Sequence, residues 1–220
     1  MRVDLLVLAG GRGERLGGQD KAALEVGGHS MLDRVLEAAA LLGGSVVVVG
    51  DTPVPEGVAR TLEDPPDGGP VAGIAAGLEA LAAAPAGGAP ASGASPSGVS
   101  PTGWVAVVAV DQPGAAPALA ALGAALPGLP ADVDAVSHED GTGHRQWLLA
   151  VYRRAALEAA LARLDSPRDT SVRRLVAGLR WQVVEGGTEH LGDVDTWEDA
   201  ARWEQRLVED VGRRRDARRR

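Results

Sequence analysis

The sequence of 220 residues contains no cysteine and no phenylalanine, and aromatic residues make up only 3% of it. The absence of cysteine excludes disulfides, thiolate metal sites and cysteine nucleophiles, and it suits a reducing cytosol. No apolar run approaches the ~20 residues that a membrane span needs. The run Leu5 to Ala9, preceded by Asp4, is too short for the core of a signal peptide. We therefore expect a soluble, cytoplasmic protein without a membrane segment.

Negative charge exceeds positive charge, with a net charge of −8, but the two are unevenly distributed. The last ten residues contain six Arg and one Asp, so the rest of the chain is more acidic than the total suggests. An acidic body argues against a nucleic-acid-binding protein. We expect residues 1–208 to form one domain and residues 209–220 to be a basic, disordered tail.

Apolar runs without alternation predict strands that are buried on both faces, at residues 3–9, 45–50 and 104–111. Helical spacing predicts a helix at 30–42, with Ser30 as its N-cap, and another at 71–84, entered through Pro70. Further helices are predicted at 115–126, 155–164, 171–179 and from 195 onward, with strands at 132–138 and 181–185.

The order of these elements predicts the fold class. Buried strands that alternate with helices are typical of an α/β protein with three layers, Rossmann-like, in which helices cover both faces of a mostly parallel sheet. The apolar run at 147–154 is ambiguous between strand and helix. Residues 85–103, rich in Gly, Ala, Pro and Ser, are expected to form a flexible loop.

A glycine-rich segment, LAGGRGERLGGQDK, follows the first predicted strand. Its glycines allow a sharp turn whose N–H groups can face phosphate oxygens without interference from a Cβ. Arg12, Arg15 and Lys21 add positive charge that suits a triphosphate. The segment is not a Rossmann fingerprint, because Leu16 occupies the third glycine position. It is not a P-loop either, because Lys and Ser or Thr do not follow Gly18 directly.

Asp111 ends the strand predicted at 104–111. A carboxylate at the carboxyl end of a strand is well placed to hold Mg²⁺ against phosphates approached from the glycine loop. Asp is also common at the start of a turn, and Pro113 follows closely, so position alone leaves both roles open. The four His residues (29, 138, 144 and 190) show no ligand spacing and are interpreted as surface or loop residues.

Several motifs together resemble the nucleotidyltransferases of sugar-nucleotide type, whose N-terminal signature is LAGG-x-x-x-R-(M/L)-G-x-x-K. The doubled Gly17-Gly18 and the pair Asp20-Lys21 are most similar to the molybdenum cofactor guanylyltransferases. The resemblance covers residues 1–80, 104–113 and 190–203. It includes the motifs Glu63-Asp64-Pro65, Gly69-Pro70-Val71-Ala72-Gly73-Ile74, Asp111-x-Pro113 and DVDTWEDAARW.

This resemblance implies an Mg²⁺-dependent enzyme that transfers GMP from GTP to a phosphorylated acceptor, molybdopterin cofactor, and releases pyrophosphate. It also implies a transient contact with an enzyme that receives the finished cofactor. The residues expected to act in catalysis are Lys21, Arg15 and Asp111. Those expected to bind the nucleotide are Leu8, Ala9, Gly10, Gly11, Gly13, Lys21, Asp51, Asp64 and Asp111. Asp111 and Asp193 are the expected metal ligands. Asp195 or Thr196 is expected to cap the last helix, and Asp195 is interpreted as that cap.

Other functions stay open at the level of the sequence. Within the same chemistry they are a cytidylyltransferase for the same cofactor, or a guanylyl- or uridylyltransferase for another phosphorylated metabolite. Outside it they are a non-catalytic nucleotide-binding protein and a dinucleotide-dependent oxidoreductase, for which Gly11-x-Gly13 is a partial motif. The acceptor is expected to contact the second half of the chain, where Arg145 in His144-Arg145-Gln146-Trp147 could hold its phosphate.

Overall fold

The computed structural model describes residues 1–10, 19–83 and 103–217, with side chains up to residue 210. Its centre is a seven-stranded sheet with the order β5-β4-β1-β6-β8-β7-β9. Six of these strands run in one direction, and β8 (Arg145–Arg153) is antiparallel to both of its neighbours. The six are β1 (Val3–Leu8), β4 (Gly43–Val49), β5 (Ala59–Thr61), β6 (Trp104–Ala109), β7 (Ala135–Glu139) and β9 (Trp181–Val183). The predicted mostly parallel sheet is confirmed.

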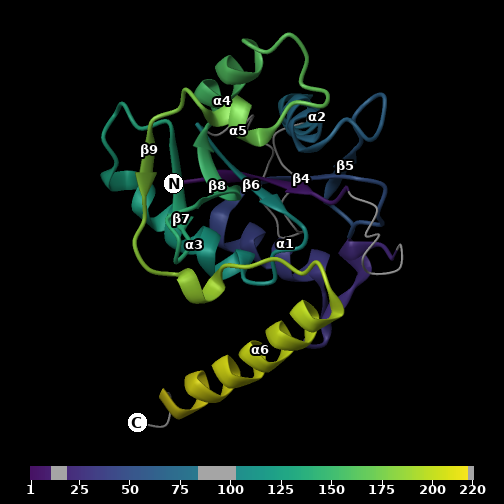
Figure 1. Cartoon of the computed structure of the whole chain (residues 1–220), viewed down its shortest axis with the longest axis vertical. Helices are drawn as coiled ribbons and strands as arrows, with labels where there is room; N and C mark the ends of the chain where they lie inside the picture. The colour runs from purple at the N-terminus through teal and green to yellow at the C-terminus, as the bar shows by residue number, and fades with distance from the viewer. Residues whose placement is uncertain (11–18, 84–102, 218–220) are drawn as a thin grey trace, which may run out of the picture.

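Helices cover both faces of the sheet (Figure 1). On one face lie α1 (Met31–Leu42) and α3 (Ala115–Ala125); on the other lie α2 (Pro70–Ala83), α4 (Arg154–Leu161) and α5 (Val172–Val176). Each interface has its own apolar cluster. Leu5 and Val7 of β1 belong to the first cluster, and Leu6 and Leu8 belong to the second. Because successive side chains of a strand point to opposite faces, an unbroken apolar run serves both clusters. The predicted three-layer α/β fold is confirmed.

Local signals placed the first helix correctly. The Ser30 hydroxyl accepts a hydrogen bond from the backbone N–H of Asp33, as an N-cap does. Gly43, with φ of 68°, follows the last residue of α1, and such a left-handed residue is the usual end of a helix. The run of valines that comes next forms β4, where β-branched side chains pack well.

Three short strands were not predicted. The pair β2 (Glu25–Val26) and β3 (His29–Ser30) forms a small antiparallel hairpin, and β5 lies at the edge of the large sheet. Gly27 and Gly28 have φ of 58° and 77°, which a two-residue hairpin turn requires. The ambiguous run at 147–154 is strand for most of its length, as part of β8.

The last helix, α6 (Trp197–Ala217), is longer than expected (Figure 1). The described backbone stays helical as far as residue 217, beyond residue 209, where we expected a disordered tail to begin. Arg and Ala are good helix formers, so the basic run continues a helix that buried Ala200 and Trp203 anchor to the body. Among the described residues, no helix is long and apolar enough to cross a membrane. Apart from Gly103, the loop expected at 85–103 falls outside the described residues.

The interpretation of all four His residues as surface or loop residues is wrong for His138. This residue lies in β7 and is only 1% exposed. Its Nδ1 lies 2.9 Å from the carbonyl oxygen of Val184, and its Nε2 lies 3.3 Å from that of Ala118. The N–H of the neutral ring can donate to one or the other of these two carbonyls, depending on the tautomer, which gives the buried imidazole a partner.

Candidate active site

The carboxyl ends of β1, β4, β5 and β6 meet at one edge of the sheet, and the backbone stays paired just beyond them. The N–H of Ala9 donates to the carbonyl of Val49 (2.8 Å), and the N–H of Val110 donates to that of Leu8 (2.9 Å). Gly50, with φ of 155°, lies so close to Ala9 that an added Cβ would come within 2.8 Å of the Ala9 carbonyl. The residues that follow these strands are therefore held side by side, where open parallel sheets bind their ligands.

Lys21 is presented from a short turn that is tied to this edge. Asp20 caps the 3₁₀ helix η2 (Lys21–Ala23) by accepting a hydrogen bond from the backbone N–H of Ala22 (2.9 Å). The other oxygen of the Asp20 carboxylate accepts from the hydroxyl of buried Thr52 (2.8 Å), which follows β4. Asp20 thus ties the turn to the end of β4, and Lys21 extends from this turn toward the end of β6.

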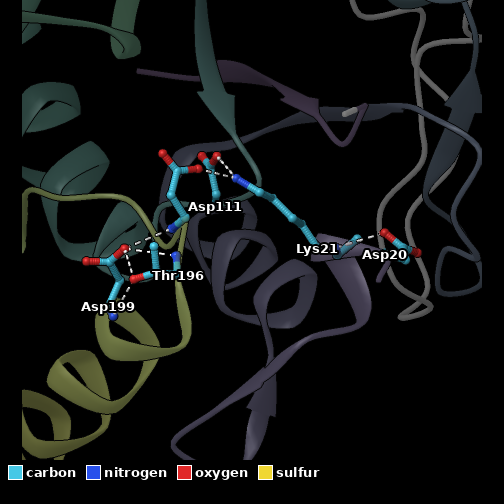
Figure 2. Close-up of polar contacts among 7 residues, drawn as sticks. Asp20, Lys21, Asp111, Thr196 and Asp199 are labelled. Atoms are coloured by element: carbon cyan, nitrogen blue, oxygen red, sulfur yellow. Dashed lines mark hydrogen bonds and ion pairs between the residues drawn. The ribbon is translucent and has the colours of Figure 1, made fainter. Parts of the chain in front are cut away.

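The Lys21 ammonium joins two acids that are far apart in the sequence. Its Nζ lies 3.0 Å from Oδ2 of Asp111 and 2.6 Å from Oδ1 of Asp195, and Figure 2 shows the side chain extended toward Asp111. The side chains of Lys21 and Asp111 are 17% and 22% exposed. Such partly buried, charge-assisted hydrogen bonds are stronger than surface ion pairs.

The pKa values of this group reflect burial and mutual charge. Burial alone would lower the pKa of Lys21, but hydrogen bonds and charge from Asp195 and Asp111 outweigh it, so the pKa is raised. Burial raises the pKa of Asp111; Lys21 opposes this rise, while the charges of Asp193 and Asp195 add to it. One ammonium therefore faces an excess of negative charge, and Asp111 would be stabilised by a further cation.

Asp195 reaches the site because other residues cap α6. The carboxylate of Asp199 accepts from the backbone N–H of Asp195 (3.2 Å) and of Thr196 (2.9 Å), while the Thr196 hydroxyl accepts from the N–H of Asp199. This capping box leaves the Asp195 side chain pointing toward Lys21, so the interpretation of Asp195 as the helix cap is wrong. The N–H of Val194 also donates to the Asp111 carbonyl (2.9 Å), which places the segment before α6 directly beside the end of β6.

A cleft of about 1090 Å³ opens from this cluster across the edge of the sheet. Leu8, Val49 and Leu62 give it an apolar wall, and Lys21, Asp111 and Asp195 lie along it. The start of α2 closes another side, where Gly73 lets the helix backbone come close to the side chain of Leu8. An apolar cleft with a few convergent polar groups is the usual form of a small-molecule site.

Comparison with known proteins agrees with this geometry. Residues 5–184 match the family described as the MobA-like NTP transferase domain, and this match covers most of the chain. The chain belongs to this family. It is therefore a member of the nucleotidyltransferase family that the sequence motifs suggested.

Proteins similar to this chain have names that refer to different activities. A probable molybdenum cofactor guanylyltransferase from Methanosarcina acetivorans is 40% identical over 33% of this chain. The match spans only 38% of that relative's own length. The solved molybdopterin-guanine dinucleotide biosynthesis protein A from Archaeoglobus fulgidus has a TM-score of 0.61 at 20% identity, over 94% of this chain and 100% of that one. The 2-C-methyl-D-erythritol 4-phosphate cytidylyltransferase from Thermus thermophilus has a TM-score of 0.57 at 22% identity, over 93% and 98%. At these identities the two structures establish the shared fold.

The residues that the sequence assigned to a MobA-like site are mostly gathered in the cleft. Those that line it are Leu8, Ala9, Gly10, Lys21, Asp51 and Asp111. Asp51 is 87% exposed and pairs with Arg60 (2.9 Å), and Asp64 does not line the cleft although Glu63 and Pro66 do. Gly11, Gly13 and Arg15 lie outside the described residues. Asp193 is exposed, and its role as a metal ligand stays a prediction.

Sequence reasoning missed Asp195, Asp20 and Thr52 as parts of the site. Thr196 followed three residues later by Asp199 was a signal for the capping box, and it would have left Asp195 without a capping role. The contact between Asp20 and Thr52 had no signal in the sequence, because it joins residues 32 positions apart.

Proposed function

We propose that the chain transfers GMP from GTP to the phosphate group of molybdopterin cofactor and releases pyrophosphate. The observation that carries this proposal is the contact of Lys21, from the turn after the glycine loop, with both Asp111 and Asp195 at the edge of the cleft. A triphosphate needs positive charge and a metal-binding acid within reach of each other, and this contact brings the two together. The family membership and the guanylyltransferase relative favour GTP and this acceptor.

The residues present fit a magnesium ion. The Lys21 ammonium lies between two carboxylate oxygens, so these oxygens already converge on one cation. Carboxylate oxygens are the hard ligands that Mg²⁺ prefers, and one or two of them are enough because the remaining positions go to water and phosphate. Among the described residues no group of three or more His, Cys, Asp or Glu side chains could hold a metal. Asp111 and Asp195 would hold the ion, and when bound it neutralises charge on the phosphates.

The residues of the chain have separate tasks in this proposal. Lys21, kept protonated by its raised pKa, turns from the two acids to the phosphates and balances the charge that develops on the leaving pyrophosphate. The backbone at Ala9 and Gly10 approaches the phosphates. Leu8, Val49 and Leu62 shield the nucleoside from water. The contribution of the cleft is mainly orientation and charge neutralisation, as in phosphoryl transfer.

The proposed acceptor needs no general base from the protein. Of the described residues that line the cleft, none is His, Ser, Thr or Cys. A phosphate monoester is already largely ionised near neutral pH, so its oxygen can attack without losing a proton to the protein.

The test is release of pyrophosphate by the purified chain with molybdopterin cofactor and each of GTP, CTP, UTP and ATP, with and without Mg²⁺. We expect release with GTP that depends on both Mg²⁺ and the acceptor. Preference for CTP would identify a cytidylyltransferase instead. Binding of GTP without turnover would favour a non-catalytic protein, and binding of NAD without dependence on Mg²⁺ would favour an oxidoreductase.

A further inference from the structure

The loop between β5 and α2 forms one wall of the cleft. We call residues 63–69 the wall loop, because Glu63, Pro66, Asp67 and Gly69 all line the cleft. Pro65 and Pro66 have no backbone N–H, so this loop has few donors with which to bind itself into a fixed shape. Its carbonyl groups need donors from elsewhere in the molecule.

Those donors come from the segment between α4 and α5, residues 166–170, which we call the bracing segment. Nη1 of Arg168 donates to the carbonyl of Pro65 (2.9 Å) and to that of Pro66 (3.2 Å). The backbone N–H of Asp169 donates to the carbonyl of Gly68 (2.9 Å). Three carbonyls of the wall loop are thus held by two consecutive residues about a hundred positions later in the sequence.

The bracing segment is itself fixed. The backbone N–H of Arg168 donates to the Ser166 hydroxyl (3.1 Å), and the Thr170 hydroxyl donates to the Ser166 carbonyl (2.9 Å). The Arg168 guanidinium also lies 3.8 Å from the Asp169 carboxylate. These contacts hold Arg168 within a hydrogen-bonded turn.

The backbone conformation is unusual where the wall loop meets the bracing segment. Of the residues that the structure describes, two other than glycine have positive φ, and both lie at this junction: Asp67 (61°) and Asp169 (55°). Non-glycine residues adopt this conformation at a cost, and they keep it where surrounding contacts determine it, often at functional sites. A Cβ on Gly68 would come within 2.7 Å of the Cβ of Ala72 in α2 and 3.3 Å of Arg168 Nη1, so glycine gives room for α2 at this point and keeps Arg168 close to the wall loop.

We infer that the bracing segment is a positioning element of the nucleotide site, in which Arg168 holds the wall loop in the shape that receives the nucleotide. Arg168 does not line the cleft and acts through Pro65 and Pro66. The inference rests on the proposed function only in that the cleft binds a nucleotide. The inference includes α4 and α5, which flank the bracing segment, among the parts of the fold that determine nucleotide affinity.

The test compares Arg168→Met, which keeps the aliphatic stem but removes the donors, with Arg168→Lys, which keeps one charged donor group. The matched control is Arg173→Met, an exposed Arg on α5. We expect Arg168→Met to weaken the Kd for GTP with Mg²⁺, measured by isothermal titration, about tenfold, which corresponds to one charge-assisted hydrogen bond. We expect Arg168→Lys to recover part of the loss and Arg173→Met to bind as the wild type does.

Kinetics separate positioning from a general loss of structure. In Arg168→Met the KM for GTP should rise about tenfold while kcat at saturating GTP changes less than about twofold, because the catalytic side chains are intact. Hydrogen exchange should become faster in peptides covering 62–72 and 166–171 and stay unchanged in β1 and β6. A normal Kd and KM in Arg168→Met would overturn the inference, and so would a loss of affinity shared equally by Arg173→Met. Should Arg168→Met fail to fold, Arg168→Lys against the same control gives the decision.

Failure of the inference can be told apart from failure of the proposed function. If the wild type binds GTP with Mg²⁺ but transfers nothing, the proposed function is wrong, and the Kd comparison still decides the role of Arg168. If the wild type binds none of the four nucleotides, both are wrong. If transfer occurs and Arg168→Met matches the wild type, only the inference is wrong.

Discussion

Acidic and basic side chains meet at both ends of the parallel strands, which we call the amino edge and the carboxyl edge of the sheet. The two groups differ in their contacts and in their exposure. At the amino edge, the Arg154 guanidinium lies 3.5 Å from Asp4 and 2.9 Å from Glu158, and it donates to the carbonyl of Leu78. Asp4 also accepts from the backbone N–H of Ser45. The side chains of Arg154 and Asp4 are 7% and 5% exposed, and they are packed within the structure. At the carboxyl edge, Lys21 faces Asp111 and Asp195 on an open cleft.

The difference shows how the same residue types serve stability in one place and chemistry in another. The Arg154 fork has several donors directed at different acceptors, so the buried charge of Asp4 is compensated by neighbours in the chain. Lys21 is a single compact cation between two acids, with the charge of a third, Asp193, also acting on Asp111. That excess of negative charge is useful only if another cation arrives, which makes this edge the candidate for metal and phosphate chemistry.

The substitution Asp111→Asn tests the chemical role of the carboxyl edge most directly. Loss of this carboxylate removes a proposed ligand of the metal, so we expect transfer to fall by about 10³-fold or more. The unfolding midpoint in urea should change little, because a partly buried charge with a raised pKa is replaced by a neutral side chain of the same shape. Pyrophosphate release measures the rate of transfer, and urea unfolding measures the unfolding midpoint. A rate near that of the wild type would remove Asp111 from the mechanism.

Arg154→Met should have the opposite profile. It leaves the buried Asp4 without its guanidinium, and breaking a buried pair in this way costs about 3–5 kcal/mol of unfolding free energy. The rate of transfer per folded molecule should not change, because Arg154 lies at the other edge of the sheet. The double variant Asp4→Asn with Arg154→Met is the control and should recover part of the stability. A loss of activity without a loss of stability would contradict the structural role.

Lys21→Ala should reduce transfer by about 10²-fold through the loss of charge stabilisation on the pyrophosphate. It should also change the pH profile. Lys21 opposes the burial-induced rise in the pKa of Asp111, so without it that pKa rises further. Because a carboxylate with a higher pKa loses its charge at higher pH, the acidic limb of the rate profile should move upward in pH. An unmoved limb would show that Asp111 does not control it.

The substitutions Asp195→Asn and Asp193→Asn test which of these residues is the second acid of the proposed metal site. The structure brings Asp195 to the Lys21 ammonium, so we expect Asp195→Asn to raise the Mg²⁺ concentration for half-maximal rate about tenfold. Asp193→Asn should change it less than about twofold, because this side chain is exposed. Titration of Mg²⁺ at saturating GTP measures both. The reverse order of effects would restore the sequence-based choice of Asp193.

The parts of the fold that could be predicted are those determined by local pattern. The valines of β4 and the Ser30 cap gave their elements correctly, because burial on both faces and capping leave direct signatures in the sequence. Strand β8 stayed ambiguous because apolar residues run through it without a period that separates strand from helix. The hairpin at Gly27-Gly28 does have a signal in the sequence, which is a glycine pair between two short extended runs.

The site was predictable only in part, for a different physical reason. Lys21 and Asp111 each follow a buried strand, and parallel strands bring such residues to the same edge. Asp195 and Asp193 are separated by one residue, and the sequence does not say which of them faces inward. That depends on the hydrogen bond from Val194 to Asp111 and on the capping box of Thr196 and Asp199, which are settled only when the whole chain is folded.

The bond from the Val194 N–H to the Asp111 carbonyl has a consequence for the order in which the protein is assembled. During synthesis, the strands from β1 to β9 leave the ribosome before residue 195 does. The strands of the sheet therefore emerge before the second acid of the charged cluster does. The charged cluster is complete only when the segment before α6 docks against the end of β6.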